Sequence, residues 1–472
     1  NQATIIYNYY YRDEAKTEPV KSVITSADEK LVCPYRGLFA FSYIHAEYFF
    51  GREVFVKELV QASHARNFIT VLGASGSGKS SVVLAGLVPT LQQQGNWKFT
   101  HFRPSDGNDP FYALAQALVP LYLSGIDSTD EITQARKLAE TLRNGQPLSD
   151  VFGYIHKQHP NHRVLLIVDQ FEELYTQVED ETIRRNFLDC LLTIIQSSAN
   201  KSSPSTVIVA TMRVDFLGKA LAYPAFAEVL RNADIKIRSM NRDELREVIE
   251  KPALKIGVAF QEGLVERILN DVENEPGHLP LLEFALASLW GQRQGRLLTH
   301  TAYEEIGEVR GSLAKYADQK YSELSSTDQK QAQHIFIQLV RPGDGTEDTR
   351  RIATRTEIGE ENWDLVARLA NDRLVVSNSD SKTGKDTLEI VHEALIWGWE
   401  RLREWLNADR NFRNWQERLR STMRQWEANN KDDGALLKGA LLKEAQSWLQ
   451  TRPEEVNLIE RDFIDRSLKL QK

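Results

Sequence analysis

Short apolar runs alternate with helical stretches between residue 34 and about residue 238. The runs lie at 67–73, 98–104, 162–169, 205–213 and 233–239. They are rich in the β-branched and aromatic residues that are typical of strands. Short strands that are separated by helices imply parallel strands joined by crossovers. The sequence therefore predicts a doubly wound α/β domain with a five-stranded parallel sheet over residues 34–238.

The pattern changes on both sides of this domain. Residues 1–33 hold a short β-prone tyrosine run and a polar stretch, which we interpret as a linker from a missing effector domain. Residues 239–299 have a wholly helical pattern and predict a helical subdomain. Residues 300–400 contain helices and then two β-prone runs around a polar turn, which suggests a winged helix. Residues 401–472 predict a C-terminal helical arm.

The composition makes some classes of protein unlikely for this chain. The chain has 472 residues, a net charge of -8 and 42% hydrophobic residues. It contains no apolar run near the roughly 18 residues that a membrane span needs, so we expect no membrane partner. Two cysteines without disulfide or metal spacing fit a reducing cytosol, which predicts a cytoplasmic protein. The negative charge makes nucleic acid an unlikely general partner.

The run at 67–73 leads into GASGSGKSS, residues 73–81. This stretch satisfies G-x-x-x-x-G-K-[ST], the Walker A pattern of a P-loop, between a predicted strand and a predicted helix. Its glycines let backbone N–H groups hold phosphate oxygens at a helix N-terminus, Lys79 adds a positive charge, and Ser80 offers a hydroxyl to Mg²⁺. The alternative is a flexible turn with an exposed lysine. The predicted nucleotide-binding residues here are Gly73, Ser75, Gly76, Ser77, Gly78, Lys79, Ser80 and Ser81.

A carboxylate follows the apolar run at 162–169, in the sequence RVLLIVDQFEEL. A magnesium nucleotide site needs such a group at the end of a buried strand, so Asp169 is the Walker B candidate and shares the metal with Ser80. Glu172 or Glu173 would polarise the attacking water. Alternatively, these two glutamates form the solvated start of the next helix.

Two arginines are further candidates. Arg213 ends the strand TVIVATMR, where it would sense the γ-phosphate and act in catalysis; alternatively it pairs with Asp215. Arg52 lies in FFGRE, about 15 residues before the predicted strand, where a loop can fold over the adenine. Arg52 is equally compatible with a surface charge.

With these motifs placed, the chain resembles the STAND class of signal-transducing ATPases from about Cys33 to its C-terminus. It is most similar to the bacterial "novel STAND" module, a relative of NACHT and NB-ARC proteins. The motifs that carry the resemblance are CPYRGLFAF, FFGRE, GASGSGKSS, VDQFEEL, TMRVDFL, PGHLPLLEFAL and VHEALI. The chain departs from the NACHT form at Gln170, and it has HEAL where plant and animal relatives have an MHD-like triplet.

The resemblance implies roles that spacing alone does not give. It implies an AAA+/STAND-type P-loop fold, adenine nucleotides (ATP and ADP) with Mg²⁺, and slow Mg-dependent ATP hydrolysis. Pro280 would pack against the base and ribose, and His392 would touch the β-phosphate of ADP. It further implies an ATP/ADP-controlled switch in bacterial signalling or immunity, held closed by ADP. The implied partners are a fused N-terminal effector, a C-terminal WD-repeat sensor, and further copies of the chain in the ATP form.

Two other functions stay open at this stage. The first is a DNA-dependent P-loop ATPase that acts through the winged helix, although the candidate recognition helix, NWDLVARLANDR, carries two Arg against two Asp. The second is a scaffold that keeps nucleotide only for stability. Six of the nine tryptophans lie between Trp397 and Trp448, and their spacing favours a helical core over a stacking surface for single-stranded nucleic acid.

Overall fold

In the computed structural model the chain forms two compact units. The first ends at Ser312 and the second begins at Leu313. The structure describes residues 31–106, 109–123, 127–178, 180–198, 205–272, 279–343, 347–372, 374–380, 385–391, 393–428 and 431–471. The division into five segments at 33, 238, 299 and 400 stays a prediction. Both cysteines are free thiols, as expected.

A five-stranded parallel sheet forms the centre of the first unit. Its strands are β1 (Phe68–Gly73), β2 (Trp97–Phe102), β3 (Arg163–Val168), β4 (Thr206–Arg213) and β5 (Asp234–Lys236). Their order across the sheet is β2-β3-β4-β1-β5, and every pair is parallel. The predicted sheet and its five strands are thereby confirmed. The order places the end of β1 beside the end of β4, with β3 next to β4 on its other side.

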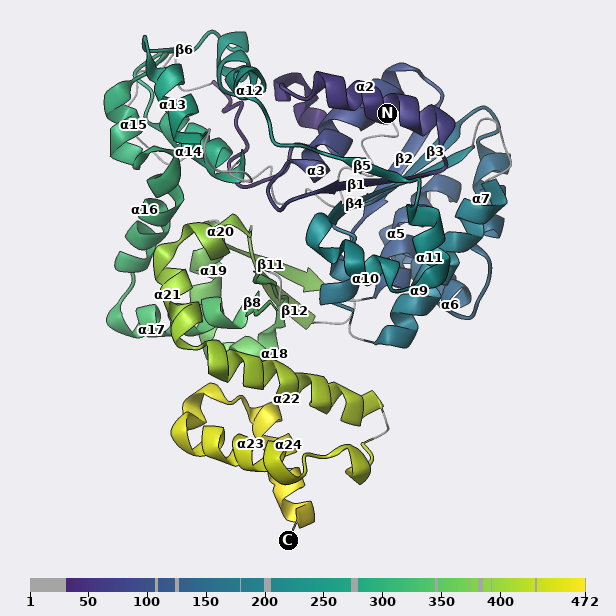
Figure 1. Cartoon of the computed structure of the whole chain (residues 1–472), viewed down its shortest axis with the longest axis vertical. Coiled ribbons are helices and arrows are strands. Elements are labelled where there is room, and N and C mark those ends of the chain that lie inside the picture. Colours follow the sequence, from purple (N-terminus) through teal and green to yellow (C-terminus); the bar gives the residue numbers. More distant parts are fainter. Residues whose placement is uncertain are drawn as a thin grey trace. The chain divides into compact units, whose positions relative to one another are not determined.

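Alternate residues of the strands enter two separate cores. Phe68 and Leu72 face one core and Ile69 and Val71 the other, and β3 and β4 alternate in the same way. Helices cover both faces (Figure 1). One face carries α2 (Glu53–Ala65), α3 (Lys79–Ser81), the π-helical segment η3 (Val82–Leu87) and α4 (Val88–Gln93). The other carries α5 (Pro110–Tyr122), α6 (Ser128–Arg143), α7 (Leu148–Gln158), α9 (Glu181–Ser198), α10 (Leu217–Leu221) and α11 (Pro224–Leu230).

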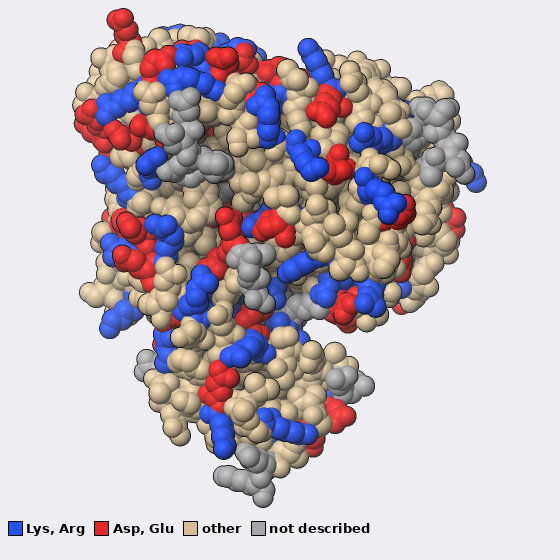
Figure 2. Space-filling model, in the orientation of Figure 1, with Lys and Arg blue, Asp and Glu red and all other residues tan. Residues whose placement is uncertain are grey.

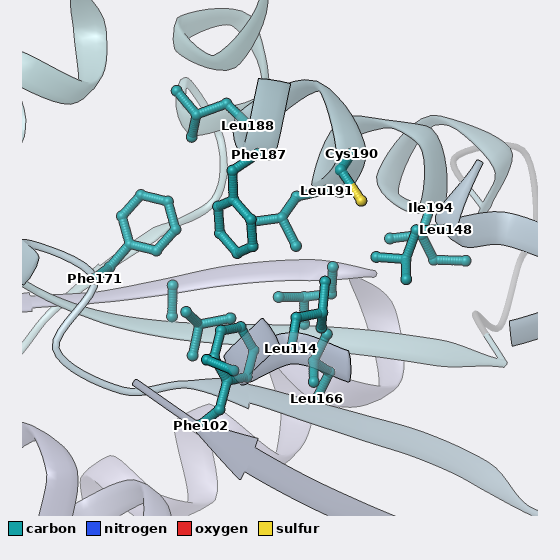
Figure 3. Close-up of a cluster of buried hydrophobic side chains, with 14 of the residues drawn as sticks. Phe102, Leu114, Leu148, Leu166, Phe171, Phe187, Leu188, Cys190, Leu191 and Ile194 are labelled. Carbon is teal, nitrogen blue, oxygen red and sulfur yellow. The ribbon is translucent and has the colours of Figure 1, made fainter. Parts of the chain in front are cut away.

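The core that contains Phe68 and Leu72 also fixes the turn that follows β3. Figure 3 shows the Phe171 side chain pointing toward Phe187 and Leu188 of α9. Phe171 also stacks on Phe226 of α11, with ring centroids 5.5 Å apart. Aromatic burial of this kind is worth several kcal/mol in a core, on the order of 3–5 for removal of a Phe side chain. The residues around Phe171 are therefore held firmly at the carboxyl end of the sheet.

The remainder of the first unit is mostly helical. It contains α12 (Arg242–Lys255), α13 (Leu264–Val272), α14 (Leu279–Gly291), α15 (His300–Ile306) and the start of α16 (Glu308–Ser322). Two short strands, β6 (Ala259–Phe260) and β7 (Leu297–Leu298), pair in parallel between them. The expectation of a wholly helical pattern was wrong at these strands, because two residues are too few to produce a period of alternation. Short helices η2 (Tyr43–Tyr48), α8 (Glu173–Thr176) and η5 (Val214–Phe216) complete the unit.

The second unit combines helices with a small sheet. Helices α17 (Ser326–Gln338), α18 (Arg355–Ile358), η6 (Glu360–Asn362) and α19 (Trp363–Asn371) precede a hairpin of β11 (Val375–Asp380) and β12 (Lys385–Ile390). β10 (Ala353–Thr354) adds a third, antiparallel strand, and β8 (Val340–Arg341) pairs with β9 (Thr349–Arg350). The predicted pair of strands is confirmed. That these elements make a winged helix stays a prediction.

Helices make up the rest of this unit. They are α20 (Ala394–Gly398), α21 (Glu400–Ala408), α22 (Arg410–Ala428), η7 (Asp433–Ala435), α23 (Gly439–Thr451), η8 (Pro453–Glu455) and α24 (Leu458–Gln471). Trp399, Trp415 and Trp426 are buried, which confirms that these tryptophans serve packing. A buried Arg420 donates to Glu460 at 2.7 Å and to Gln338 at 2.6 Å, linking α22, α24 and α17.

Candidate nucleotide-binding site

The P-loop connects the central strand β1 to the helical run that begins at Lys79. Gly76 and Gly78 have φ angles of 70° and 86°, which glycine adopts without steric cost. A side chain at Gly73 would place its Cβ 2.4 Å from Ile237 and 2.7 Å from the Ser77 hydroxyl. The sequence therefore needs glycine at these positions to let the backbone curl at a helix N-terminus, an arrangement suited to binding anions.

Lys79 is folded over this loop. Its ammonium donates to the carbonyl oxygens of Ala74 at 2.8 Å and Gly73 at 3.2 Å, and the residue is only 8% exposed. A buried ammonium is costly unless it is paired or hydrogen-bonded. The alternative of a loop with an exposed lysine is excluded by this burial. The positive charge is held within the loop rather than released to solvent.

Arg52 supports the P-loop from the side. It is 4% exposed and donates through Nη2 to the carbonyl oxygen of Ser77 at 3.2 Å, so it is not a surface charge. Burial lowers its pKa to about 10, which leaves it protonated at neutral pH. Its Nε–H is buried and has no partner among the described residues. An unpaired buried donor beside a P-loop fits an anionic or polar ligand.

Ser81, by contrast, is engaged by the protein itself. Its hydroxyl accepts the backbone N–H of Phe41 at 3.1 Å. The stretch 33–41 thus reaches the helix that follows the P-loop. Ser75 and Gly76 are half-buried, and Ser77 donates to the Ala74 carbonyl at 2.9 Å.

Asp169, the predicted Walker B residue, contacts the P-loop serine Ser80. It directly follows β3 and is 1% exposed. Its Oδ1 accepts the Ser80 hydroxyl at 2.6 Å and the Thr211 hydroxyl at 2.7 Å, and its Oδ2 lies 3.4 Å from Nε of Arg103. Burial alone would raise the pKa of this carboxyl, but the Arg103 charge and the two hydroxyl donors together lower it. The side chain is therefore an ionised carboxylate next to the P-loop serine, as the predicted shared Mg²⁺ site requires.

The turn after Asp169 is braced by β4. Gln170 adopts a left-handed φ of 53°, and its N–H donates to the Thr211 hydroxyl at 2.9 Å. The N–H of Phe171 donates to the Thr211 carbonyl at 2.8 Å. Thr211 therefore contacts Asp169 and the next two residues at once.

Glu172 and Glu173 point to opposite neighbours of β3. The Glu172 carboxylate accepts the backbone N–H of Arg213, at the end of β4, at 3.2 Å. The Glu173 carboxylate accepts the Ser105 hydroxyl, after β2, at 2.6 Å. Both glutamates are buried, at 9% and 8% exposure, so they are not a solvated helix start, although Glu173 does begin α8. Because β1 lies next to β4, Glu172 is on the P-loop side and Glu173 is not.

Arg213 lies at the site but is paired within the chain. Its Cα is the register partner of Gly73, and it is 3% exposed. Its Nε and Nη2 donate to the two carboxylate oxygens of Asp215 at 3.1 and 2.8 Å. The expected alternative, a pair with Asp215, is therefore present. A role in sensing the γ-phosphate stays a prediction.

Two candidates come from the later parts of the chain. α14 begins at Leu279, whose Cδ1 would lie 3.7 Å from a Cβ at Gly78, so the half-buried Pro280 follows a residue that borders the P-loop. His392 lies outside the described residues, and its contact with ADP stays a prediction. The described part of the chain has no group of three or more His, Cys, Asp or Glu side chains suited to a metal. It also has no helix both long and apolar enough for a membrane crossing.

Sequence reasoning missed three residues of the site: Thr211, Arg103 and Ser105. Thr211 and Arg103 lie at or just beyond the carboxyl ends of predicted strands, where ligands of parallel sheets bind. That position was the available signal. Their contacts, however, depend on which strands are neighbours.

Comparison with known proteins agrees with these motifs. The family model "Novel STAND NTPase 1" matches residues 34–434. The chain belongs to this family. It is a STAND-type P-loop NTPase. P-loop NTPases in general bind a nucleotide together with Mg²⁺. None of the curated proteins matches the chain.

Several solved structures match the chain at low identity. The ORC1 protein of Aeropyrum pernix, in complex with DNA, is 15% identical; the match covers 77% of this chain and 94% of that one, with a TM-score of 0.40. The ORC2 protein of Aeropyrum pernix, as ADPNP-ADP complexes, is 14% identical over 77% and 92%, with a TM-score of 0.39. Cdc6p of Pyrobaculum aerophilum is 13% identical over 76% and 94%, with a TM-score of 0.33.

Proposed function

We propose that the chain is an ATP/ADP-controlled switch that hydrolyses ATP slowly in the presence of Mg²⁺. The observation that carries the nucleotide and Mg²⁺ part of this proposal is the 2.6 Å hydrogen bond between the hydroxyl of the P-loop residue Ser80 and Asp169, the proposed Walker B carboxylate. Lys79, held in the loop by two carbonyl oxygens, supplies the positive charge that phosphates need. Family membership supports the same conclusion.

In this proposal each side chain has one role. Lys79 and the backbone N–H groups of the P-loop bind the phosphates. Ser80 and Asp169 hold Mg²⁺, which when bound neutralises charge on the phosphate oxygens. Glu172 orients the attacking water, because it lies on the β4 side, nearest the P-loop, whereas Glu173 is bonded to Ser105 on the β2 side.

The switch acts through contacts that differ between the two nucleotides. A ligand shifts a conformational equilibrium only as far as its affinities for the two states differ. Arg213 is a candidate for this discrimination, since it would exchange Asp215 for the γ-phosphate when ATP is present. Pro280 and His392 are the proposed contacts to the base and to the β-phosphate of ADP. Slow turnover follows because hydrolysis resets a signal.

The wider setting is also part of the proposal. We expect a cytoplasmic protein of bacterial signalling or immunity, in which the ATP form self-associates and brings fused N-terminal effector domains together. A C-terminal WD-repeat sensor would supply the trigger. These expectations rest on the resemblance to STAND proteins.

The alternative, a DNA-dependent ATPase, finds less support. The candidate recognition helix α19 offers Arg368, but its guanidinium is paired with Asp328 at 2.9 Å. On the face shown in Figure 2, basic and acidic side chains are interspersed. Phosphate backbones are bound by basic patches on one face. Nucleic-acid binding would be detected as a gel shift that weakens with salt.

The proposed switch is tested by the mass of the full chain in solution. We expect a smaller particle with ADP and Mg²⁺ than with a non-hydrolysable ATP analogue, and ADP as the nucleotide that co-purifies. One mass under both conditions, with no nucleotide in the purified protein, would contradict the switch.

A further inference from the structure

Arg103 is the one cationic side chain that the hydrogen bonds and ion pairs of the described residues place on Asp169. It is the first residue after β2, and β2 pairs with β3 in the register Phe102 to Val168. The Asp169 N–H donates to the Phe102 carbonyl at 2.9 Å. The strand register therefore fixes Arg103 beside Asp169, although 66 residues separate the two.

The two oxygens of Asp169 have different partners. Oδ1 accepts both hydroxyls, from Ser80 and Thr211, while Oδ2 lies 3.4 Å from Nε of Arg103. We propose above that Asp169 binds Mg²⁺. A divalent cation at Asp169 would therefore meet a carboxylate that Arg103 already contacts. Two positive charges held a few ångströms apart repel each other, so the Arg103 guanidinium and a divalent cation at Oδ2 would disfavour one another.

The Arg103 side chain reaches solvent, unlike that of Asp169. Its side chain is 36% exposed, whereas that of Asp169 is 2% exposed. Its backbone is fixed, because its N–H donates to Asp106 at 2.8 Å. Only the guanidinium end needs to turn toward solvent for the contact at Oδ2 to open.

We propose that Arg103 is a positioning residue that holds Asp169 when no divalent cation is bound and competes with that cation for Oδ2. It thereby sets how much Mg²⁺ the nucleotide site requires. This inference rests on the nucleotide site proposed above. It concerns the metal alone and predicts that Arg103 does not bind the phosphates.

The test measures the affinity for a fluorescent ADP over a range of free Mg²⁺, from chelator to millimolar concentrations, on the full chain. For Arg103→Gln we expect the half-saturating Mg²⁺ concentration to fall about three- to tenfold, with the affinity in chelator unchanged. Arg103→Lys keeps the charge and should stay near the wild type. Arg143→Gln is the matched control, because Arg143 is an exposed arginine on α6 that pairs with Asp109, the N-cap residue of α5, instead of with Asp169.

Three results would overturn the inference. The first is an unchanged or increased Mg²⁺ requirement in Arg103→Gln, with thermal unfolding confirming that the variant is folded. The second is a loss of ADP affinity in chelator, which would make Arg103 a phosphate ligand. The third is an equal change in Arg143→Gln, which would reflect net charge alone. If the wild type binds no nucleotide with or without Mg²⁺, the proposed nucleotide site itself fails, and the inference falls with it.

Discussion

Thr211→Val tests whether β4 holds the carboxylate of Asp169 in place. Valine has nearly the shape of threonine but lacks the hydroxyl. The substitution removes the 2.7 Å bond to Asp169 and leaves the N–H of Gln170 without its 2.9 Å acceptor, at a residue that is 0% exposed. A bond to a charged group is worth about 1.5–3 kcal/mol, and an orphaned buried donor costs about 1–3 kcal/mol.

We therefore expect the free energy of unfolding of the first unit to fall by about 3 kcal/mol. At roughly 2–4 °C per kcal/mol for a large domain, the melting temperature should fall by roughly 6–12 °C. We also expect the affinity for Mg²⁺-ADP to fall about tenfold, equivalent to about 1.4 kcal/mol, because Asp169 loses one of the two hydroxyls that orient it.

The assay is calorimetric unfolding of the full chain together with titration of ADP at fixed Mg²⁺. The unfolding transition of the first unit is the one that shifts when ADP is added. Thr100→Val is the control, since Thr100 is also buried in the sheet but donates to the Ala117 carbonyl at 2.7 Å. It should lose about 1 kcal/mol of stability and keep its affinity for Mg²⁺-ADP. Equal affinities in the two variants would refute the proposed role of Thr211.

Three further predictions concern single side chains. Glu172→Gln should lower ATP hydrolysis by about 10²-fold or more, while Glu173→Gln lowers it less than tenfold; equal rates of phosphate release would refute this assignment. Glu283→Gln should flatten the pH dependence of the free energy of unfolding. Burial raises the pKa of the Glu283 carboxyl from 4.5 to about 8. The stability that this carboxyl contributes below pH 4.5 is therefore lost as the pH rises toward 8. Identical pH profiles of melting temperature would contradict that. His392→Ala should speed the release of fluorescent ADP, and an unchanged release rate would exclude the proposed contact.

The architecture of the first unit could be predicted because its signals are local. Each strand is a short apolar run, and the P-loop motif defines both a strand end and a helix start. The strands β4, which is fully buried, and β3, which is buried except for Arg163, gave long apolar runs in the sequence. Short strands such as β6 and β7 gave none, since two residues carry no periodicity.

The candidate site was predictable only in part, because side-chain partners depend on strand order. Lys79, Ser80 and Asp169 belong to motifs whose chemistry requires them together. Arg103 and Thr211 reach Asp169 only because β2 and β4 are the two neighbours of β3. The spacing of residues along the sequence does not specify the order of the strands in the sheet.

Strand order also decides between Glu172 and Glu173. The two glutamates are adjacent in the sequence and were equivalent candidates for orienting water. The left-handed Gln170 and the buried Phe171 set the turn, and the turn sends the two carboxylates toward β4 and β2 respectively. Arg213 likewise had two possible partners, and the bidentate pair with Asp215 became visible only with the fold.

The central claim is that the P-loop around Lys79 binds a nucleotide, and its most direct test is equilibrium titration of the full chain with fluorescent ADP in Mg²⁺. The account predicts saturable binding at one site per chain in the wild type. It predicts a loss of at least about 100-fold in affinity for Lys79→Ala, because the ammonium that the loop carbonyls hold is removed. Equal binding by the wild type and by Lys79→Ala would contradict it.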